Sequence, residues 1–224
     1  MRAIEFLKEG SVDKHYRVDY KTKLNELSSV HREIHKKLLS QGYQYISSGI
    51  DQHVYSEPNT NNVLKIFGTG SGASGEDFTP DQKMFFTWVR YCMRHSNNPL
   101  FPKFYGYETF QYRGKNYLQI RQEKLQTLDA DMCFLLKYLR TVANSETKYD
   151  QVKDYLFSKG DSVIEVYNDV IRTMGEKKFK LFYLTLVFLY KIAKQKGYGP
   201  DFHCGNVMQR KDRTPVFLDP WTVP

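Results

Sequence analysis

The stretch that decides the fold is GYGPDFHCGNVMQRKDRTPVFLDPW, residues 197–221. Asp201 is followed five residues later by Asn206, and the apolar run 216–218 then leads to Asp219. A turn and a short strand separate these groups, so an acid, an amide and a second acid can converge. Mg²⁺ prefers hard oxygen ligands and keeps several waters. One amide and one carboxylate are therefore enough protein ligands for a Mg²⁺ ion that is also bound to a polyphosphate. The pattern therefore predicts a base at Asp201 and a metal site at Asn206 and Asp219.

Asp and Asn also form turns, so the same stretch fits a plain helix, loop and β-hairpin without any site. The D-x-x-x-x-N spacing alone does not decide between the two interpretations. The elements that precede it supply the context a motif needs.

The composition is typical of a folded domain. A chain of 224 residues can form one large domain or two small lobes with a real core. Its apolar content of 41% and aromatic content of 15% argue against disorder. The net charge is +8, but the lysines and arginines are interleaved with acidic residues along the chain, so this charge does not predict nucleic-acid binding. No apolar run approaches the ~20 residues of a membrane span, and the charged N-terminus does not resemble a signal peptide, so we expect a cytoplasmic protein without membrane contact.

The three cysteines are Cys92, Cys133 and Cys204, an odd number at wide spacing without a C-x-x-C pair. This pattern predicts a reducing compartment, with neither a disulfide framework nor a zinc site. Cys204 falls inside the predicted catalytic loop, where we expect it to fill space rather than to act as a nucleophile.

The N-terminal part predicts a helix followed by a strand pair. Residues 1–23 lack periodicity and are treated as an extension, whereas apolar residues at helical spacing predict a helix over 24–40. Residues 43–47 and 53–56 are predicted strands on either side of Gly49. Serine hydroxyls and backbone N–H groups beside that single glycine predict a reduced phosphate-binding loop.

A third predicted strand, residues 63–67, carries Lys65 alone in an apolar run. A buried lysine needs an anion, and the phosphates of a nucleotide would supply one. An edge strand with an outward-pointing lysine is the alternative. An acid is expected to pair with Lys65, and the candidates are Glu76, Asp77 and Asp81.

The remainder of the chain alternates from strands to helices. Thr79-Pro80 opens a helix that runs to about residue 95, because proline is favoured in a first turn. The segments 101–110 and 116–125 are predicted strands. The predicted helices that follow are 128–143, roughly 150–173, and 178–196, of which the last is apolar nearly all round and should be central and buried.

These motifs together resemble the protein kinase-like superfamily, and most closely the small protein kinases of tailed bacteriophages. The resemblance covers about residues 42–221 and rests on SSGIDQHVYSEP leading to NVLKIFG, on FPKFYG before a strand pair, and on DFHCGNVM followed by FLDP. DFHCGN is also similar to the catalytic loop of aminoglycoside phosphotransferases, which have histidine at the position of His203.

The resemblance implies an α+β, two-lobed protein kinase-like fold with a small antiparallel sheet and a truncated helical lobe. The expected divisions are 1–41 as an extension with a helix, 42–123 as the N-lobe, and 124–224 as a minimal helical C-lobe with the catalytic loop. Gly199-Pro200 and Pro220-Trp221 depart from the residues usually found beside the two catalytic acids. No activation segment follows Asp219 in the sequence, so the way an acceptor would bind is left open.

The resemblance also implies ATP and Mg²⁺ as cofactors, held by positions that match the family's motifs. These are Lys65 for the phosphates, Asp201 as catalytic base, Asn206 and Asp219 for the metal, Ser48 and Gly49 in the phosphate loop, and Glu123, Lys124 and Leu125 in the hinge whose backbone meets adenine.

Three functions remain open from the sequence. The first is a Ser/Thr protein kinase of phage type that acts on host proteins. The second is a kinase of small-molecule hydroxyls, which His203 favours and the absence of the usual C-terminal helices disfavours. The third is a pseudokinase that binds nucleotide or a partner without turnover, which the single glycine of the phosphate loop favours. The sequence predicts neither the substrate nor the oligomeric state.

Overall fold

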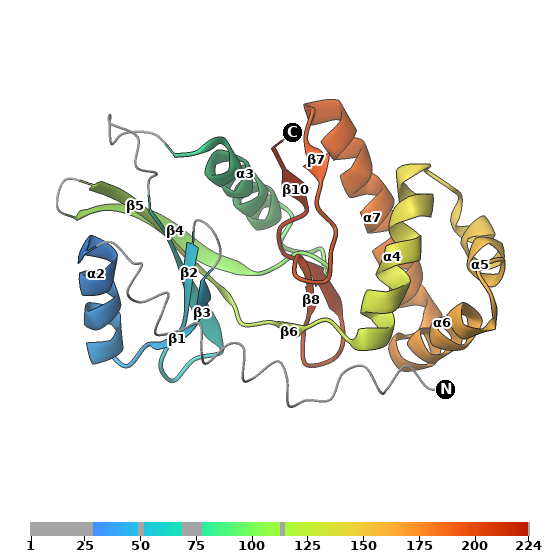
Figure 1. The fold of residues 1–224 in the computed structure, drawn as a ribbon, viewed down its shortest axis with the longest axis horizontal. Helices are drawn as coiled ribbons and strands as arrows, with labels where there is room; N and C mark the ends of the chain where they lie inside the picture. The colour runs from blue at the N-terminus through green and yellow to red at the C-terminus, as the bar shows by residue number, and fades with distance from the viewer. Residues whose placement is uncertain (1–28, 49–51, 69–77, 113–114, 224) are drawn as a thin grey trace.

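The computed structural model describes residues 29–48, 52–68, 78–112 and 115–223 (Figure 1). Several predictions from the sequence fall outside these ranges. They concern the extension 1–23, the start of the first helix, the phosphate-loop Gly49, and the acids Glu76 and Asp77.

Five antiparallel strands form the main sheet in the order β1-β2-β3-β5-β4. Their bounds are β1 Gln44–Ser48, β2 Gln52–Ser56, β3 Asn62–Gly68, β4 Phe104–Tyr112 and β5 Lys115–Glu123. Strand β3 lies in the middle, where Lys65 pairs with Val54 on one side and Ile120 on the other. The alternative of an edge strand with an outward lysine is therefore wrong.

A helix covers each face of this sheet. Helix α2 (Ser29–Ser40) packs Ile34 and Leu38 against a cluster that includes Leu64 and Ile66 of β3. Side chains alternate between the faces of a strand, so Lys65 and Phe67 point to the opposite face, which helix α3 (Pro80–Arg94) covers. The two helices lie apart with the sheet between them in Figure 1.

The start of α3 is fixed by a capping box. The Thr79 hydroxyl accepts from the Gln82 N–H at 3.2 Å, and the Gln82 side chain accepts from the Thr79 N–H at 3.0 Å. Such reciprocal bonds satisfy donors that the first helical turn leaves unpaired. The Gln82 amide also donates to the Gly68 carbonyl at 2.7 Å, which ties the helix to the end of β3.

The second lobe is helical. It contains α4 Ala130–Asn144, α5 Tyr149–Phe157, α6 Asp161–Met174 and α7 Glu176–Lys196. The single helix predicted over roughly 150–173 is wrong, because the chain breaks between α5 and α6. Gly160 adopts a φ of +106° there, and a right-handed helix cannot continue through a residue with a positive φ.

Helix α7 is central, but it is not buried on all sides as predicted. Large side chains such as Phe182, Leu186 and Leu189 are fully buried, whereas Leu181, Leu184 and Phe188 are exposed on its other face. Within the described residues, no helix is long and apolar enough to cross a bilayer.

Short strands connect the two lobes. Strands β6 (Gln126–Thr127), β8 (Val207–Gln209) and β9 (Pro215–Phe217) form a small sheet, and β7 (Gly199–Pro200) pairs with β10 (Trp221–Thr222). One hydrophobic core runs through both lobes and includes Phe85 on the sheet side and Phe182 on the helical side. The described chain therefore has the predicted α+β, two-lobed architecture.

A disulfide joins Cys133 of α4 to Cys204, although the two residues are 71 positions apart. This corrects the prediction of unpaired cysteines. The Cα atoms lie 5.5 Å apart, inside the roughly 4.4–6.8 Å range of natural disulfides. Sequence spacing gave no sign of the pair because the fold alone brings α4 beside the loop. In the chain-entropy model, a disulfide that closes a loop of this length stabilises the folded state by about 4 kcal/mol, because it restricts the unfolded chain.

Candidate active site

The loop between β7 and β8 holds Asp201 and Asn206 in one rigid turn. The Asn206 amide donates to the Asp201 carboxylate at 2.7 Å and to the Asp201 carbonyl at 3.1 Å. The Asp201 N–H donates to the Pro220 carbonyl at 2.9 Å, and the Leu218 N–H donates to the Asn206 carbonyl at 2.7 Å. The segment around Asp219 is thus bonded directly to the loop, as the sequence spacing predicts.

Lys65 of β3 and Asp219, which follows β9, lie close enough for their charges to interact. Burial lowers the pKa of the Lys65 amine, while the charge of Asp219 acts in the opposite direction. Burial also raises the pKa of the Asp219 carboxyl, and Asp201 and Asp81 raise it further while Lys65 lowers it. The site therefore concentrates negative charge around one buried cation, an arrangement that a bound metal ion would relieve.

These groups fit Mg²⁺. Because the Asn206 nitrogen donates to Asp201, the amide oxygen is turned away from that carboxylate and can meet a metal. Asp219 adds one half-buried carboxylate. A carboxylate and an amide oxygen, completed by water and phosphate oxygens, match the ligands that Mg²⁺ takes beside nucleotides.

The side chain of α3 that contacts Lys65 is Phe85, not an acid. Its ring centroid lies 5.1 Å from the Lys65 nitrogen, within cation–π range. Of the three candidate acids, Asp81 is described; it accepts from the Val223 N–H at 3.2 Å and thus binds the segment after Asp219.

Trp88 ties α3 to the segment that leads into Asp219, a contact that sequence reasoning missed. Its indole N–H donates to the Leu218 carbonyl at 2.9 Å, directly before Asp219. Its ring packs edge-on against Trp221 at 5.1 Å, and the Trp221 N–H donates to the Leu189 carbonyl at 3.3 Å. Trp88 is fully buried. The sequence did contain a signal for this contact, because Trp88 lies in an apolar run and the indole N–H of a buried tryptophan needs a hydrogen-bond acceptor.

His203 lies beside the predicted base. Its Nε2 is 3.5 Å from an Asp201 oxygen, and its Nδ1 accepts from the Gly205 N–H at 3.0 Å. In the neutral ring this leaves the proton on Nε2, facing Asp201. A Cβ at position 205 would lie 2.8 Å from His203 Cε1, so glycine permits the ring to fold over the loop.

Gly205→Ala is expected to move the His203 ring away from Asp201 while the protein stays folded, because His203 is exposed and can rotate. Ring NMR shifts of His203 should change, and the unfolding free energy should fall by less than about 1 kcal/mol. Any loss of turnover should vanish when Gly205→Ala is made in a His203→Ala background. An additional loss in that background would show that the glycine acts through the backbone instead.

The predicted hinge residues are held by an ion pair between the lobes. Arg210, after β8, donates from Nε and Nη2 to the two Glu123 oxygens at 2.9 and 2.6 Å. Its guanidinium also donates to the Pro99 and Phe101 carbonyls. Glu123 lies at the end of β5 and is buried, so this bidentate pair fixes the hinge to both lobes.

The same region limits how a base could be bound. The Glu123 N–H donates to the Lys103 carbonyl and the Lys124 N–H to the Asn61 carbonyl, both at 2.9 Å. A nucleotide base would therefore have to meet carbonyl oxygens here or the N–H of Leu125. Ser48 is the last residue of β1, immediately before the undescribed residues 49–51.

Arg210→Met is expected to lower the unfolding free energy by about 3–5 kcal/mol, because the buried Glu123 carboxylate loses its counter-ion and keeps only the bond from the Lys103 N–H. Urea denaturation measures this. Arg172→Met is the matched control: it breaks an exposed pair with Asp169 and should cost less than about 1 kcal/mol. Equal losses in the two variants would contradict a structural role for the pair between Arg210 and Glu123.

Comparisons with known proteins find likeness among solved structures. No family model and no curated protein matches the chain. Among solved structures, the MAP kinase LmaMPK10 from Leishmania major matches 85% of this chain with a TM-score of 0.38 at 12% sequence identity. The match covers 50% of that protein, so the chain spans about half the length of the kinase.

The described chain has a two-lobed α+β fold. Its sheet carries Lys65 on a central strand under α3, and its helical lobe presents Asp201, Asn206 and Asp219 at the lobe junction. The roles of these residues are taken up as proposals below.

Proposed function

We propose that this protein is an ATP-dependent phosphotransferase, a minimal Ser/Thr protein kinase of phage type that acts on host proteins in the host cytoplasm. The observation that carries the proposal is the convergence of Lys65, Asp201, Asn206 and Asp219, which come from three separate segments of the chain. A turn-forming use of Asp and Asn would not require a buried lysine opposite them.

Each side chain has a distinct task in this proposal. Lys65 binds phosphate oxygens. These anionic oxygens take the place of the water that the lysine amine loses on burial. Asn206 and Asp219 hold Mg²⁺, which neutralises charge on the transferring phosphoryl group. Asn206 also occupies one Asp201 oxygen, so the other oxygen, on the His203 side, remains to orient an acceptor hydroxyl and take its proton.

The hinge and the strand pair complete the proposed nucleotide site. The backbone of Glu123, Lys124 and Leu125 would meet adenine, and Ser48 and Gly49 would approach the phosphates. We expect the acceptor to be a protein, with neither a nucleic acid nor a membrane involved.

A small-molecule hydroxyl is the second candidate acceptor. His203 favours it, since its Nε2 lies 3.5 Å from Asp201 as part of a loop similar to that of aminoglycoside phosphotransferases. Phe85 opposite Lys65 favours the third possibility, a nucleotide-binding protein without turnover, because no acid of α3 contacts the lysine among the described residues.

The test incubates purified protein with ATP labelled on its terminal phosphate, Mg²⁺ and a bacterial lysate, alongside the Asp201→Asn variant. Labelled protein bands that depend on Asp201 would support the protein kinase. A labelled small molecule would support the second candidate. ATP binding without transfer to any acceptor would overturn the proposed activity and leave a nucleotide-binding protein.

A further inference from the structure

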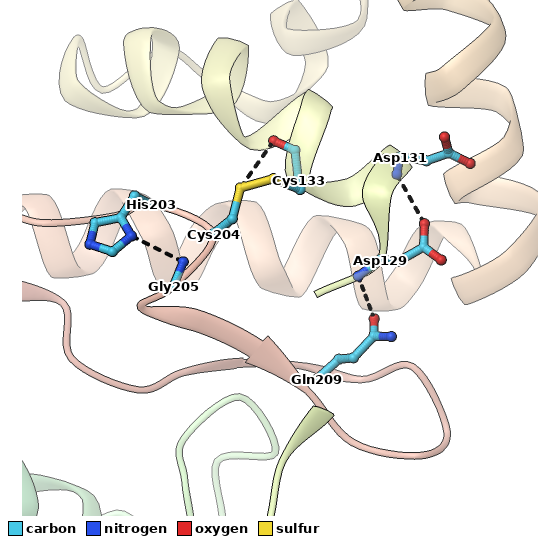
Figure 2. The surroundings of a disulfide bond; sticks show 7 residues. All are labelled: Asp129, Asp131, Cys133, His203, Cys204, Gly205 and Gln209. Atoms are coloured by element: carbon cyan, nitrogen blue, oxygen red, sulfur yellow. Dashed lines mark hydrogen bonds between the residues drawn. A yellow bond between two sulfur atoms is a disulfide. The ribbon is translucent and has the colours of Figure 1, made fainter. Parts of the chain in front are cut away.

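The disulfide between Cys133 and Cys204 attaches the tip of the catalytic loop to helix α4 (Figure 2). Cys204 stands between His203 and Gly205, which are both exposed, and the two cysteines are half-buried. Small thiols in solution can therefore reach the bridge from the loop side. Its position beside Asp201 distinguishes it from a bridge that merely closes a surface loop.

The two ends of this loop are anchored without the bridge. Phe202 is fully buried, with its ring centroid 4.7 Å from that of Tyr190 and 5.9 Å from that of Phe217. Val207 is fully buried and pairs with Phe217 in the small sheet. Asp201 and Asn206, which adjoin these anchors, should keep their positions whether or not the bridge is present.

The tip, residues 203–205, is held differently. Its hydrogen bonds in the described part of the chain stay inside the loop, apart from the contacts of Cys204 with Cys133. If the bridge opens, the Cys204 thiol can still donate to the Cys133 carbonyl, whose oxygen lies 3.7 Å from the sulfur. That weak bond cannot replace a covalent link, so opening the bridge should loosen the tip rather than unfold the loop.

The other end of the bridge is a firm anchor. Cys133 lies in the first turn of α4, where the Asp129 side chain accepts from the Asp131 N–H at 3.1 Å. The Asp129 N–H donates to the Gln209 side chain at 3.2 Å, which connects the start of α4 to β8 (Figure 2). The bridge thus joins the tip of the loop to a helix that is already bonded to β8, the strand that follows the loop.

We propose that Cys133 and Cys204 are a reversible thiol–disulfide switch that sets the order of the loop tip and, through it, the position of His203 beside Asp201. The bridged form holds His203 against Asp201, and the reduced form releases it. The effect on the loop stands on the structure alone, whereas its effect on turnover rests on the proposed kinase function.

The switching step is ordinary thiol–disulfide exchange with a low-molecular-weight thiol of the glutathione class. One thiolate attacks a bridge sulfur; the S–S bond breaks, and the other cysteine sulfur leaves and takes up a proton. A second thiol resolves the mixed disulfide. Overall, two thiols are oxidised to one disulfide while Cys133 and Cys204 are reduced to thiols, and the reverse sequence restores the bridge.

The first measurement follows the loop itself. Full-length protein is equilibrated with oxidised glutathione or with dithiothreitol, and free thiols are counted after denaturation. They should fall from three to one on oxidation, since Cys92 alone stays free. Amide hydrogen exchange in the peptide containing residues 203–205 should then be roughly tenfold slower in the oxidised form.

Two variants make this assignment specific. Cys133→Ser should abolish the redox dependence of exchange without altering the loop sequence. Cys92→Ala is the matched control, because burial raises the pKa of the Cys92 thiol and makes it unreactive, so this variant should respond as the wild type does.

The second measurement follows nucleotide binding and turnover. Reduction should lower the rate of ATP turnover roughly tenfold, since a small displacement of a catalytic-loop side chain is costly. The dissociation constant for ATP should change by less than about twofold, because Lys65 and Asp219 lie on other elements.

The outcomes separate the two proposals. Three free thiols after oxidation, or equal exchange in the two redox states, would overturn the switch. Redox-dependent exchange with no ATP turnover in either state would support the switch and overturn the proposed kinase activity. Turnover that is the same in both states despite a change in exchange would overturn the link between the loop tip and catalysis.

Discussion

Asp219→Asn is expected to lower Mg²⁺-dependent ATP turnover by about a thousandfold or more while the protein stays folded. The variant removes the carboxylate of the proposed metal pair and keeps the shape of the side chain, so charge alone is lost. The Leu218 N–H, which precedes Asp219, keeps its bond to Asn206, so the strand should keep its place. Asp154→Asn, on the exposed surface of α5, is the matched control. Near-wild-type turnover in Asp219→Asn would contradict the metal-ligand assignment.

The same variant should change how stability depends on pH in metal-free buffer. A carboxyl whose pKa is raised in the folded state stabilises the fold fully below its unfolded pKa of about 4. That contribution is lost as the pH rises through the folded pKa. Burial and the neighbouring acids raise the pKa of Asp219 in the folded protein. As the pH rises from about 4 toward neutrality, the unfolding free energy of Asp219→Asn should therefore increase relative to that of the wild type.

Lys65→Met is expected to lower ATP turnover by about a hundredfold or more, because the phosphates lose their buried cation. The cost in unfolding free energy should be below about 1 kcal/mol, since methionine fills a similar volume beside Phe85 and the desolvation cost of the amine disappears. Turnover assays and urea denaturation give the two quantities.

Two further measurements sharpen this prediction. Lys36→Met, on the exposed side of α2, should leave both turnover and stability unchanged. In Lys65→Met, the pKa of the Asp219 carboxyl should rise further, because Lys65 is the group that lowers it. Wild-type turnover together with strong unfolding would show that Lys65 serves the fold instead.

Local patterns in the sequence predicted much of this architecture. The spacing between Asp201 and Asn206 is short enough for one turn to bring them together, and the apolar strand that follows delivers Asp219 to the same place. The continuous apolar run around Lys65 identified its strand, and the burial of this strand on both faces agrees with its central position. The roles of these residues remain predictions.

Contacts between distant segments could not be predicted in this way. The bonds between Arg210 and Glu123, between Trp88 and Leu218, and between the two bridged cysteines join residues 87, 130 and 71 positions apart. Such pairs depend on how the lobes pack, and no periodicity records them. By contrast, the break at Gly160 had a local signal, because glycine after Ser158 and Lys159 favours a turn over a continued helix.

The bond from Trp88 to Leu218 has a consequence for the time course of the reaction. Together with the bond between Val223 and Asp81, it joins α3 to the segment on both sides of Asp219. The helix therefore cannot move away from that segment without breaking two hydrogen bonds and separating two tryptophan rings. The metal-site geometry would then exist before any ligand arrives. Progress curves begun from freshly diluted, phosphatase-treated protein should therefore start at their full slope, with no lag.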